Sequence, residues 1–133
     1  MGDINFWAVL VAAAANFIIG FLLHGPIGGN LWMRLANIKP TGNEKFADMV
    51  PQMIWNFVAN IVFAFVLAQM ISFNGLVDAS KGMIFAVFVW MGYVVTSTSM
   101  DVIWMGKSWK LWAYEVFSSL LSIVAMGAIL ASW

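Results

Sequence analysis

The chain of 133 residues is 63% hydrophobic and only 9% charged, and its six basic and six acidic residues leave no net charge. Soluble domains contain about 25% charged residues, and a surface this apolar would aggregate in water, so the composition excludes an ordinary soluble domain. The lack of a basic tract argues against nucleic-acid binding, and the absence of cysteine excludes disulfides, thiolate metal sites and a cysteine nucleophile.

Four long stretches of the chain contain no Lys, Arg, Asp or Glu: residues 4–33, 49–77, 82–100 and 116–133. A helix crosses the hydrocarbon core of a bilayer with about 20 apolar residues. The sequence therefore predicts an all-α integral membrane protein, a four-helix up-down bundle forming a single transmembrane domain over residues 1–133. The spans are expected at about residues 5–23, 52–73, 80–99 and 108–132.

The segment after the first span is predicted to form a short helix at the membrane surface. Asn30 is a candidate N-cap for a helix over residues 31–37. Trp32 and Arg34 in this segment suit the headgroup region. We therefore expect a short interfacial helix in the first cytoplasmic loop.

The second predicted span has a start signal and an internal proline. Thr41 and Glu44 have the spacing of a capping box, which predicts a helix start near residues 42–43. Pro51 then either kinks that helix or begins its buried part. A short loop joins the second and third spans, which we expect to be antiparallel neighbours.

Basic residues near the helix ends predict the orientation in the membrane. Cytoplasmic loops carry an excess of Lys and Arg. The loops after the first and third spans lie on one side, and the middle loop on the other side holds only Lys81. The two longer loops are therefore predicted to be cytoplasmic, with both termini outside. Their basic residues are Arg34, Lys39, Lys45, Lys107 and Lys110.

Polar side chains inside the predicted spans are the first candidates for a functional site, because each must be satisfied in lipid. Asn56 and Asn60 are about one turn apart on the second span, Asn16 lies in a small-residue stripe of the first, and Ser119 belongs to the polar face of the fourth. Two interpretations stay open. These residues either bond between helices, at about 0.6 kcal/mol each, or line a hydrophilic cavity for a small solute, an ion or a lipid headgroup.

Glu115 is the one acidic residue inside a predicted span. An ionised side chain at the bilayer centre costs about 2.5–3.5 kcal/mol on insertion scales, which the apolar residues after it offset. Near the cytoplasmic face it either pairs with Lys107, Lys110 or His24 or reaches the interface. The alternative is a role in handling a proton or a ligand.

His24 is the only histidine. Zinc sites need three or four protein ligands, so no metal site is expected. We interpret His24 as a helix-end residue that bonds the last carbonyls, the alternative being a group that titrates near neutral pH. Catalytic motifs such as a Gly-rich phosphate loop, a metal-binding His pair or a nucleophile elbow are missing, so we expect no catalytic residue and no cofactor.

Several short motifs resemble one family. The run Gly-Phe-Leu-Leu-His-Gly-Pro at residues 20–26, followed by Leu-Trp-Met-Arg-Leu at 31–35, is similar to the small bacterial membrane proteins known as domain of unknown function 1761 (DUF1761). The second half is also similar, with Trp-Met-Gly-Tyr at 90–93, Gly-Lys-Ser-Trp-Lys at 106–110 and Gly-Ala-Ile-Leu at 127–130. The resemblance covers nearly the whole chain.

This resemblance implies a four-helix integral protein of the bacterial inner membrane, with no activity assigned to the family. The chain departs from the family pattern at Leu23-His24-Gly25, where Trp-Tyr-Ser or similar is usual. It also departs at Glu115, where an uncharged polar residue is more usual. If this region binds a ligand, these departures imply a ligand different from that of the relatives.

The sequence favours a non-enzymatic packing or accessory component that associates with itself, as a homo-oligomer, or with a larger membrane complex. The alternative is an oligomeric transporter or channel for a small solute or ion that uses an intramembrane polar face. An enzyme is the third possibility, because no acid–base pair or nucleophile stands out. The candidate ligand or pathway residues are Asn16, His24, Asn56, Asn60, Ser119 and Glu115.

Overall fold

The computed structural model describes residues 3–39 and 41–133, and within these ranges all regular structure is helical. Four helices are long and apolar enough to cross a membrane, as the charge-free stretches predict. The third of these consists of α4, a π-helical segment η1, and α5 in direct succession. The elements are α1 Phe6–His24, α2 Gly29–Ala36, α3 Phe46–Phe73, α4 Ala79–Val89, η1 Trp90–Val95, α5 Thr96–Met105 and α6 Trp109–Ser132.

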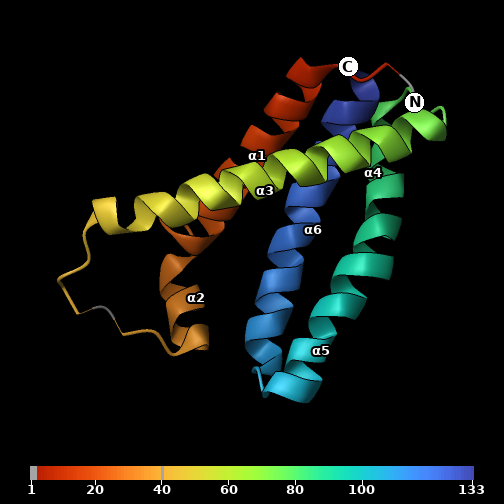
Figure 1. Ribbon diagram of the computed structural model, residues 1–133. Helices are drawn as coiled ribbons and strands as arrows, with labels where there is room; N and C mark the ends of the chain where they lie inside the picture. Colours follow the sequence, from red (N-terminus) through yellow and green to blue (C-terminus); the bar gives the residue numbers. More distant parts are fainter. Residues whose placement is uncertain (1–2, 40) are drawn as a thin grey trace.

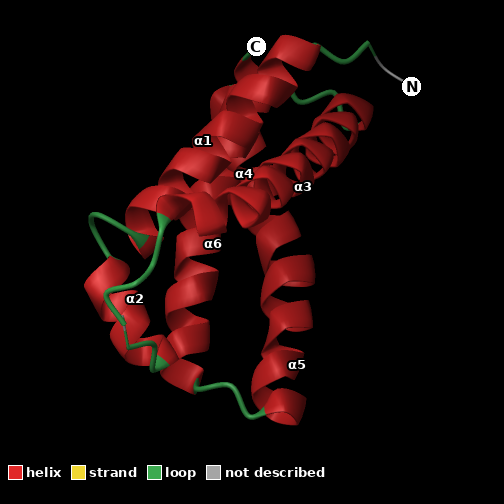
Figure 2. Ribbon diagram, turned by 60° about the vertical axis from the view of Figure 1, so that its left-hand side comes forward, coloured by secondary structure: helices red, strands yellow, loops and turns green. Residues whose placement is uncertain are grey.

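Helix α6 is the centre of the assembly and packs against every other helix (Figure 1). Helix α1 and the α4–η1–α5 helix lie on either side of it, and both ends of the chain lie at the same end of the assembly. Helix α3 runs obliquely across α1 and α6 (Figure 2). Small and aliphatic side chains fill the core where these helices meet, among them Val9, Ala12, Ala13, Ala64, Leu67 and Met126.

The expectation that the second and third spans are neighbours is wrong. Within the described ranges, the principal packing pairs are α4–α6, α1–α6, α1–α3 and α3–α6, and α3 does not pack along α4. A physical reason is the length of α3. Its 28 residues extend about 42 Å, whereas the hydrocarbon core is about 30 Å thick, and a long span adapts by tilting.

Helix α3 also begins elsewhere than predicted. It starts at Phe46, after residues 42–43 and before the expected span start at 52. The carboxylate of Glu44 accepts hydrogen bonds from the Thr41 backbone N–H at 2.7 Å and from its hydroxyl at 3.0 Å, but these bonds fold a loop instead of starting a helix. The Thr41 backbone bond is the main reason why the pKa of Glu44 lies below its ordinary value. Pro51 lies inside the helix.

The third span continues to Met105, six residues beyond the predicted end at residue 99. The polar residues at 96–99 do not stop the helix, because their hydroxyls bond back to carbonyls of the same helix. Thr96 donates to the Gly92 carbonyl at 2.7 Å and Thr98 to the Val94 carbonyl at 2.6 Å. The helix ends instead at Gly106, which has a φ of 72°.

Helix α2 forms where a short helix was predicted, but its start differs. It begins at Gly29 with Gly28 as N-cap, so Asn30 lies within the first turn and is not the cap. The helix folds back against α1 and α6 (Figure 2). Its location at the membrane surface stays a prediction.

Helices α4 and α6 approach each other most closely. A Cβ added at Gly82 would overlap the Gly127 carbonyl and the Ala131 side chain, and a Cβ at Gly127 would overlap the Gly82 carbonyl and Ala86. Small residues allow this backbone contact, which is a common basis of helix association in lipid. The α4–α6 pair is therefore the closed part of the fold.

Candidate functional site

A cleft of about 520 Å³ opens between α1, α2 and α3. It brings together four of the six candidate residues from the sequence, Asn16, His24, Asn56 and Asn60. The other residues that line it are aromatic residues, methionines and glycines: Phe17, Gly20, Phe21, Gly25, Trp32, Phe46, Met49 and Met53. This size and mixture are typical of a small-molecule site.

Side-chain amides line the cleft on both α1 and α3. Asn16 Nδ2 donates to Asn60 Oδ1 across the two helices at 3.0 Å. Within the described chain, Asn16 Oδ1 and Asn60 Nδ2 have no further partner, and the exposed side chain of Asn56 has none. The pair bonds the two helices together, as one interpretation predicted, and free amide groups remain beside it.

His24 lies at the end of α1, two turns from Asn16. Its Nδ1 is 2.9 Å from the Gly20 carbonyl oxygen, which can only accept, so Nδ1 donates. In the neutral tautomer that carries its proton on Nδ1, Nε2 is an acceptor. This is the helix-end contact that the sequence predicted. The ring edges meet Trp32 and Tyr114, with centroid distances of 5.1 Å and 6.0 Å.

Tyr114 holds the turn between α1 and α2, a role that the sequence analysis missed. Its hydroxyl donates to the Leu23 carbonyl and lies 3.4 Å from the Gly28 carbonyl. A side chain at Gly28 would occupy the position of this hydroxyl. Tyr114 thereby sets where α2, and with it the Trp32 wall of the cleft, lies against α6.

Trp32 carries an unusual polar atom. Its Nε1 is buried and has no hydrogen-bond partner among the described residues. An unsatisfied buried donor costs about 1–3 kcal/mol. The indole nevertheless forms part of the cleft wall and packs edge-on against His24.

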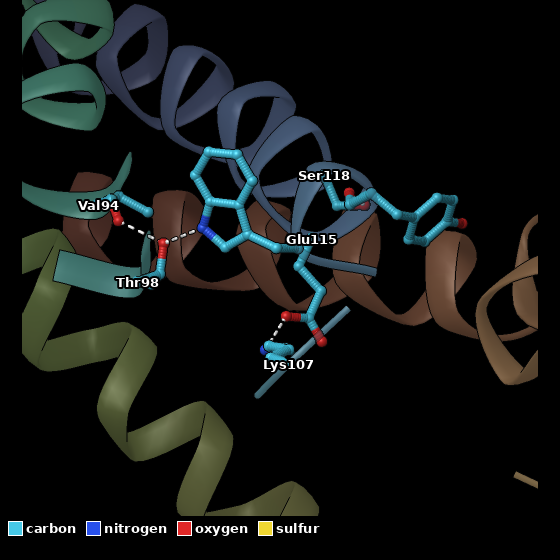
Figure 3. Close-up of polar contacts among 7 residues, drawn as sticks. Val94, Thr98, Lys107, Glu115 and Ser118 are labelled. Carbon is cyan, nitrogen blue, oxygen red and sulfur yellow. Dashed lines mark hydrogen bonds and ion pairs between the residues drawn. The ribbon is translucent and has the colours of Figure 1, made fainter. Parts of the chain in front are cut away.

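The other two candidates, Glu115 and Ser119, lie outside the cleft. Glu115 forms an ion pair with Lys107, one of the three partners that the sequence offered (Figure 3). Both side chains are about a quarter to a third exposed, at 25% and 32%. Solvated pairs of this kind contribute about 0–1 kcal/mol, so the geometry supports the structural interpretation of Glu115.

Ser119 belongs to a contact with Trp90, which is the one tryptophan in the middle of a span. Trp90 Nε1 donates to the Val116 carbonyl at 2.8 Å and lies 3.1 Å from Ser119 Oγ. Farther along the same pair of helices, Trp112 Nε1 donates to Thr98 Oγ1 at 3.1 Å (Figure 3). Two indoles therefore join α6 to its neighbour through polar contacts, and the mid-span position of Trp90 was the available sequence signal.

None of the residues that line the cleft is Lys, Arg, Asp or Glu. Among residues 3–39 and 41–133, no group of three or more His, Cys, Asp or Glu side chains is placed to hold a metal ion. The arrangement offers neutral hydrogen-bonding groups between aromatic and thioether walls.

Residues 7–131 match the family described as Protein of unknown function (DUF1761). The chain belongs to this family. The match agrees with the motif resemblance and spans all four membrane-length helices. No curated protein and no solved structure matches the chain. The DUF1761 chain is thus a multi-pass membrane protein whose family has no assigned activity.

Proposed function

We propose that this DUF1761 protein is a non-enzymatic accessory component of a membrane, and that it self-associates through the outer face of the α4–η1–α5 helix. The resemblance to bacterial proteins and the excess of basic residues in two loops support an orientation in the bacterial inner membrane with both termini outside. The Ser, Thr and Glu side chains near mid-span and the cytoplasmic end are engaged in bonds within the fold, which supports a structural role.

The observation that carries the proposal is an exposed patch at the junction of η1 and α5. It consists of Gly92, Tyr93, Thr96 and Ser97, which we call the hydroxyl patch. Thr96 and Ser97 each bond to the carbonyl four residues earlier, so the four residues adjoin on one surface. A Cβ added at Gly92 would meet no atom within 4 Å. No packing within the chain therefore requires this glycine.

The side chain of Tyr93 favours a partner molecule over the hydroxyl patch. It lies near the middle of a membrane-length helix, its side chain is 66% exposed, and its hydroxyl has no partner in the described chain. An unpaired hydroxyl in hydrocarbon is costly. Helix pairs in lipid commonly use small residues spaced four apart with hydroxyls beside them, as Gly92 and Thr96 are. A second copy presenting the same patch supplies partners for both phenols.

The test is the oligomeric state in lipid nanodiscs or liposomes, followed by energy transfer between labelled copies. We expect Gly92→Leu to weaken self-association at least about tenfold, because the larger side chain separates the two backbones. Gly20→Leu is the matched control, since it makes the same change at another helical glycine with open space around it. Self-association of Gly92→Leu at wild-type strength would contradict the proposal.

The gathering of Asn16, Asn56 and Asn60 in one cleft favours a second candidate, an oligomeric transporter for a small solute. The measurement is solute flux in vesicles containing the wild type and Asn60→Leu. An accessory component shows no protein-dependent flux in either case. Flux that is abolished in a normally folded Asn60→Leu variant would favour the transporter.

A further inference from the structure

The cleft between α1, α2 and α3 has features that self-association through the hydroxyl patch does not use. Its rim is formed by residues exposed on the side of the helices, with Phe21, Phe46 and Met49 being 50%, 68% and 53% exposed. Both α1 and α3 are membrane-length helices. An opening between two helices that cross the bilayer would face the lipid, so a molecule dissolved in the bilayer could enter sideways.

The polar atoms of the cleft fall into two groups. The amides of Asn16, Asn56 and Asn60 provide unpaired donors and acceptors, and His24, whose ring packs against Trp32 of α2, provides its second ring nitrogen, Nε2. Asn16 and His24 are eight residues apart on α1, which is about 12 Å along the helix axis. In lipid these groups need partners, because there is no bulk water to supply them.

The other cleft walls are aromatic rings and thioethers, from Phe17, Phe21, Trp32, Met49 and Met53. Aromatic faces and edges pack well on flat ring systems, and methionine adapts to their outline. No Lys, Arg, Asp or Glu lines the cleft, so an ion or a charged headgroup would lose its hydration without a carboxylate, ammonium or guanidinium group to balance its charge. A volume of about 520 Å³ is suited to a ring with a short apolar tail.

We propose that this cleft binds a neutral, lipid-soluble molecule with a flat ring that carries carbonyl or hydroxyl oxygens, the chemical class of quinones and phenols. The ring packs between the aromatic and methionine side chains. A carbonyl or hydroxyl oxygen accepts from the free amide hydrogens of Asn56 or Asn60, and a hydroxyl at the other end donates to His24 Nε2. The inference does not depend on self-association, because the cleft and the hydroxyl patch share no residue.

The experiment uses the full chain in lipid nanodiscs and a decyl-substituted benzoquinone as probe. The quantity measured is the probe retained by protein-containing discs in excess of empty discs. We expect a saturable excess of about one molecule per chain. An alkylbenzene of the same size, which lacks oxygen, is expected to bind about tenfold more weakly. An alkyl sulfate, which carries a charge, is expected to show no saturable excess.

Two variants test whether the probe binds in the cleft. Asn56→Leu removes the exposed amide and Gly20→Leu adds bulk in the cleft, and each is expected to weaken probe binding about tenfold or more. Gly92→Leu lies at the hydroxyl patch and is expected to bind the probe as the wild type does. Circular dichroism of each variant verifies its helix content. If Gly20→Leu fails to fold, Asn56→Leu alone decides, because its side chain is exposed.

Three results would overturn the proposal: no saturable excess of the quinone, equal binding of the alkyl sulfate, or unchanged binding by Asn56→Leu. Failure of these measurements leaves self-association untouched, since that is measured without the probe. Failure of self-association likewise leaves the binding measurement valid.

Discussion

The two sides of α6 are built on opposite principles. Toward α4, backbones touch at Gly82 and Gly127, and no added Cβ fits at either position. Toward α1 and α3, alanine and leucine side chains pack in the core, one hydrogen bond joins Asn16 to Asn60, and a cleft of about 520 Å³ remains between α1, α2 and α3. Both sides are assembled from apolar helices of similar length, so hydrophobicity does not distinguish them. The observed difference is that two glycines meet across α4 and α6, whereas asparagines line the cleft between α1 and α3.

This contrast assigns different tasks to the two sides. Water is absent inside a bilayer, so apolar side chains gain little by leaving lipid, and close contact between backbones has to hold helices together. The α4–α6 side provides that contact. The α1–α3 side packs through Ala12, Ala13 and Ala64 and, in the cleft beside them, keeps polar groups with unused hydrogen-bonding capacity, which can bind another molecule.

The largest effect on this contrast is expected from Gly82→Leu. The new side chain would overlap the Gly127 carbonyl and Ala131, so α4 and α6 must separate. We expect a loss of about 3 kcal/mol or more in the free energy of unfolding, or failure to fold. The measurement is reversible unfolding in mixed micelles followed by circular dichroism.

Gly92→Leu is the control for that experiment, because it places the same side chain in the same helix where space is open. Its stability under monomeric conditions should equal that of the wild type or exceed it by up to about 1 kcal/mol, owing to higher helix propensity. Equal destabilisation by both variants would mean that the close contact at Gly82 is not what holds the closed side together.

A smaller effect is expected on the open side, at the bond between Asn16 and Asn60. Asn60→Leu should cost about 0.6 kcal/mol of stability, and at most about 1.7, because this is the range for hydrogen bonds between membrane helices. A double-mutant cycle with Asn16→Leu isolates the pair energy. A coupling energy near zero would mean that this hydrogen bond does not stabilise the fold and that only apolar contacts hold α1 and α3 together.

Much of the fold follows from residues that are readable in the sequence. The charge-free stretches predicted four membrane-length helices, and the structure has four. The sequence also offered Lys107 among the partners of Glu115, and the structure selects it. Both features depend on hydropathy or on residues close together in the sequence, so they can be predicted from the sequence alone.

The arrangement of helices could not be predicted in the same way. A short loop after Phe73 suggested that α3 and α4 are neighbours, but loop length constrains only their ends. Whether two helices pack depends on the shapes of whole faces, such as the Gly82–Gly127 contact, which joins positions 45 residues apart. The contacts of Trp90 and Tyr114 are equally non-local, so the cleft emerged only from the structure.

The central claim is that the chain crosses a bilayer four times, and its lack of cysteine allows a direct measurement. Single cysteines replace exposed residues in three loops, as Asn43→Cys, Val77→Cys and Ser108→Cys, and a membrane-impermeant thiol reagent is applied to sealed vesicles of one orientation. We predict that Asn43→Cys and Ser108→Cys react from the same side and Val77→Cys only from the other. Reaction of all three from one side would contradict the four crossings and the cleft that faces lipid.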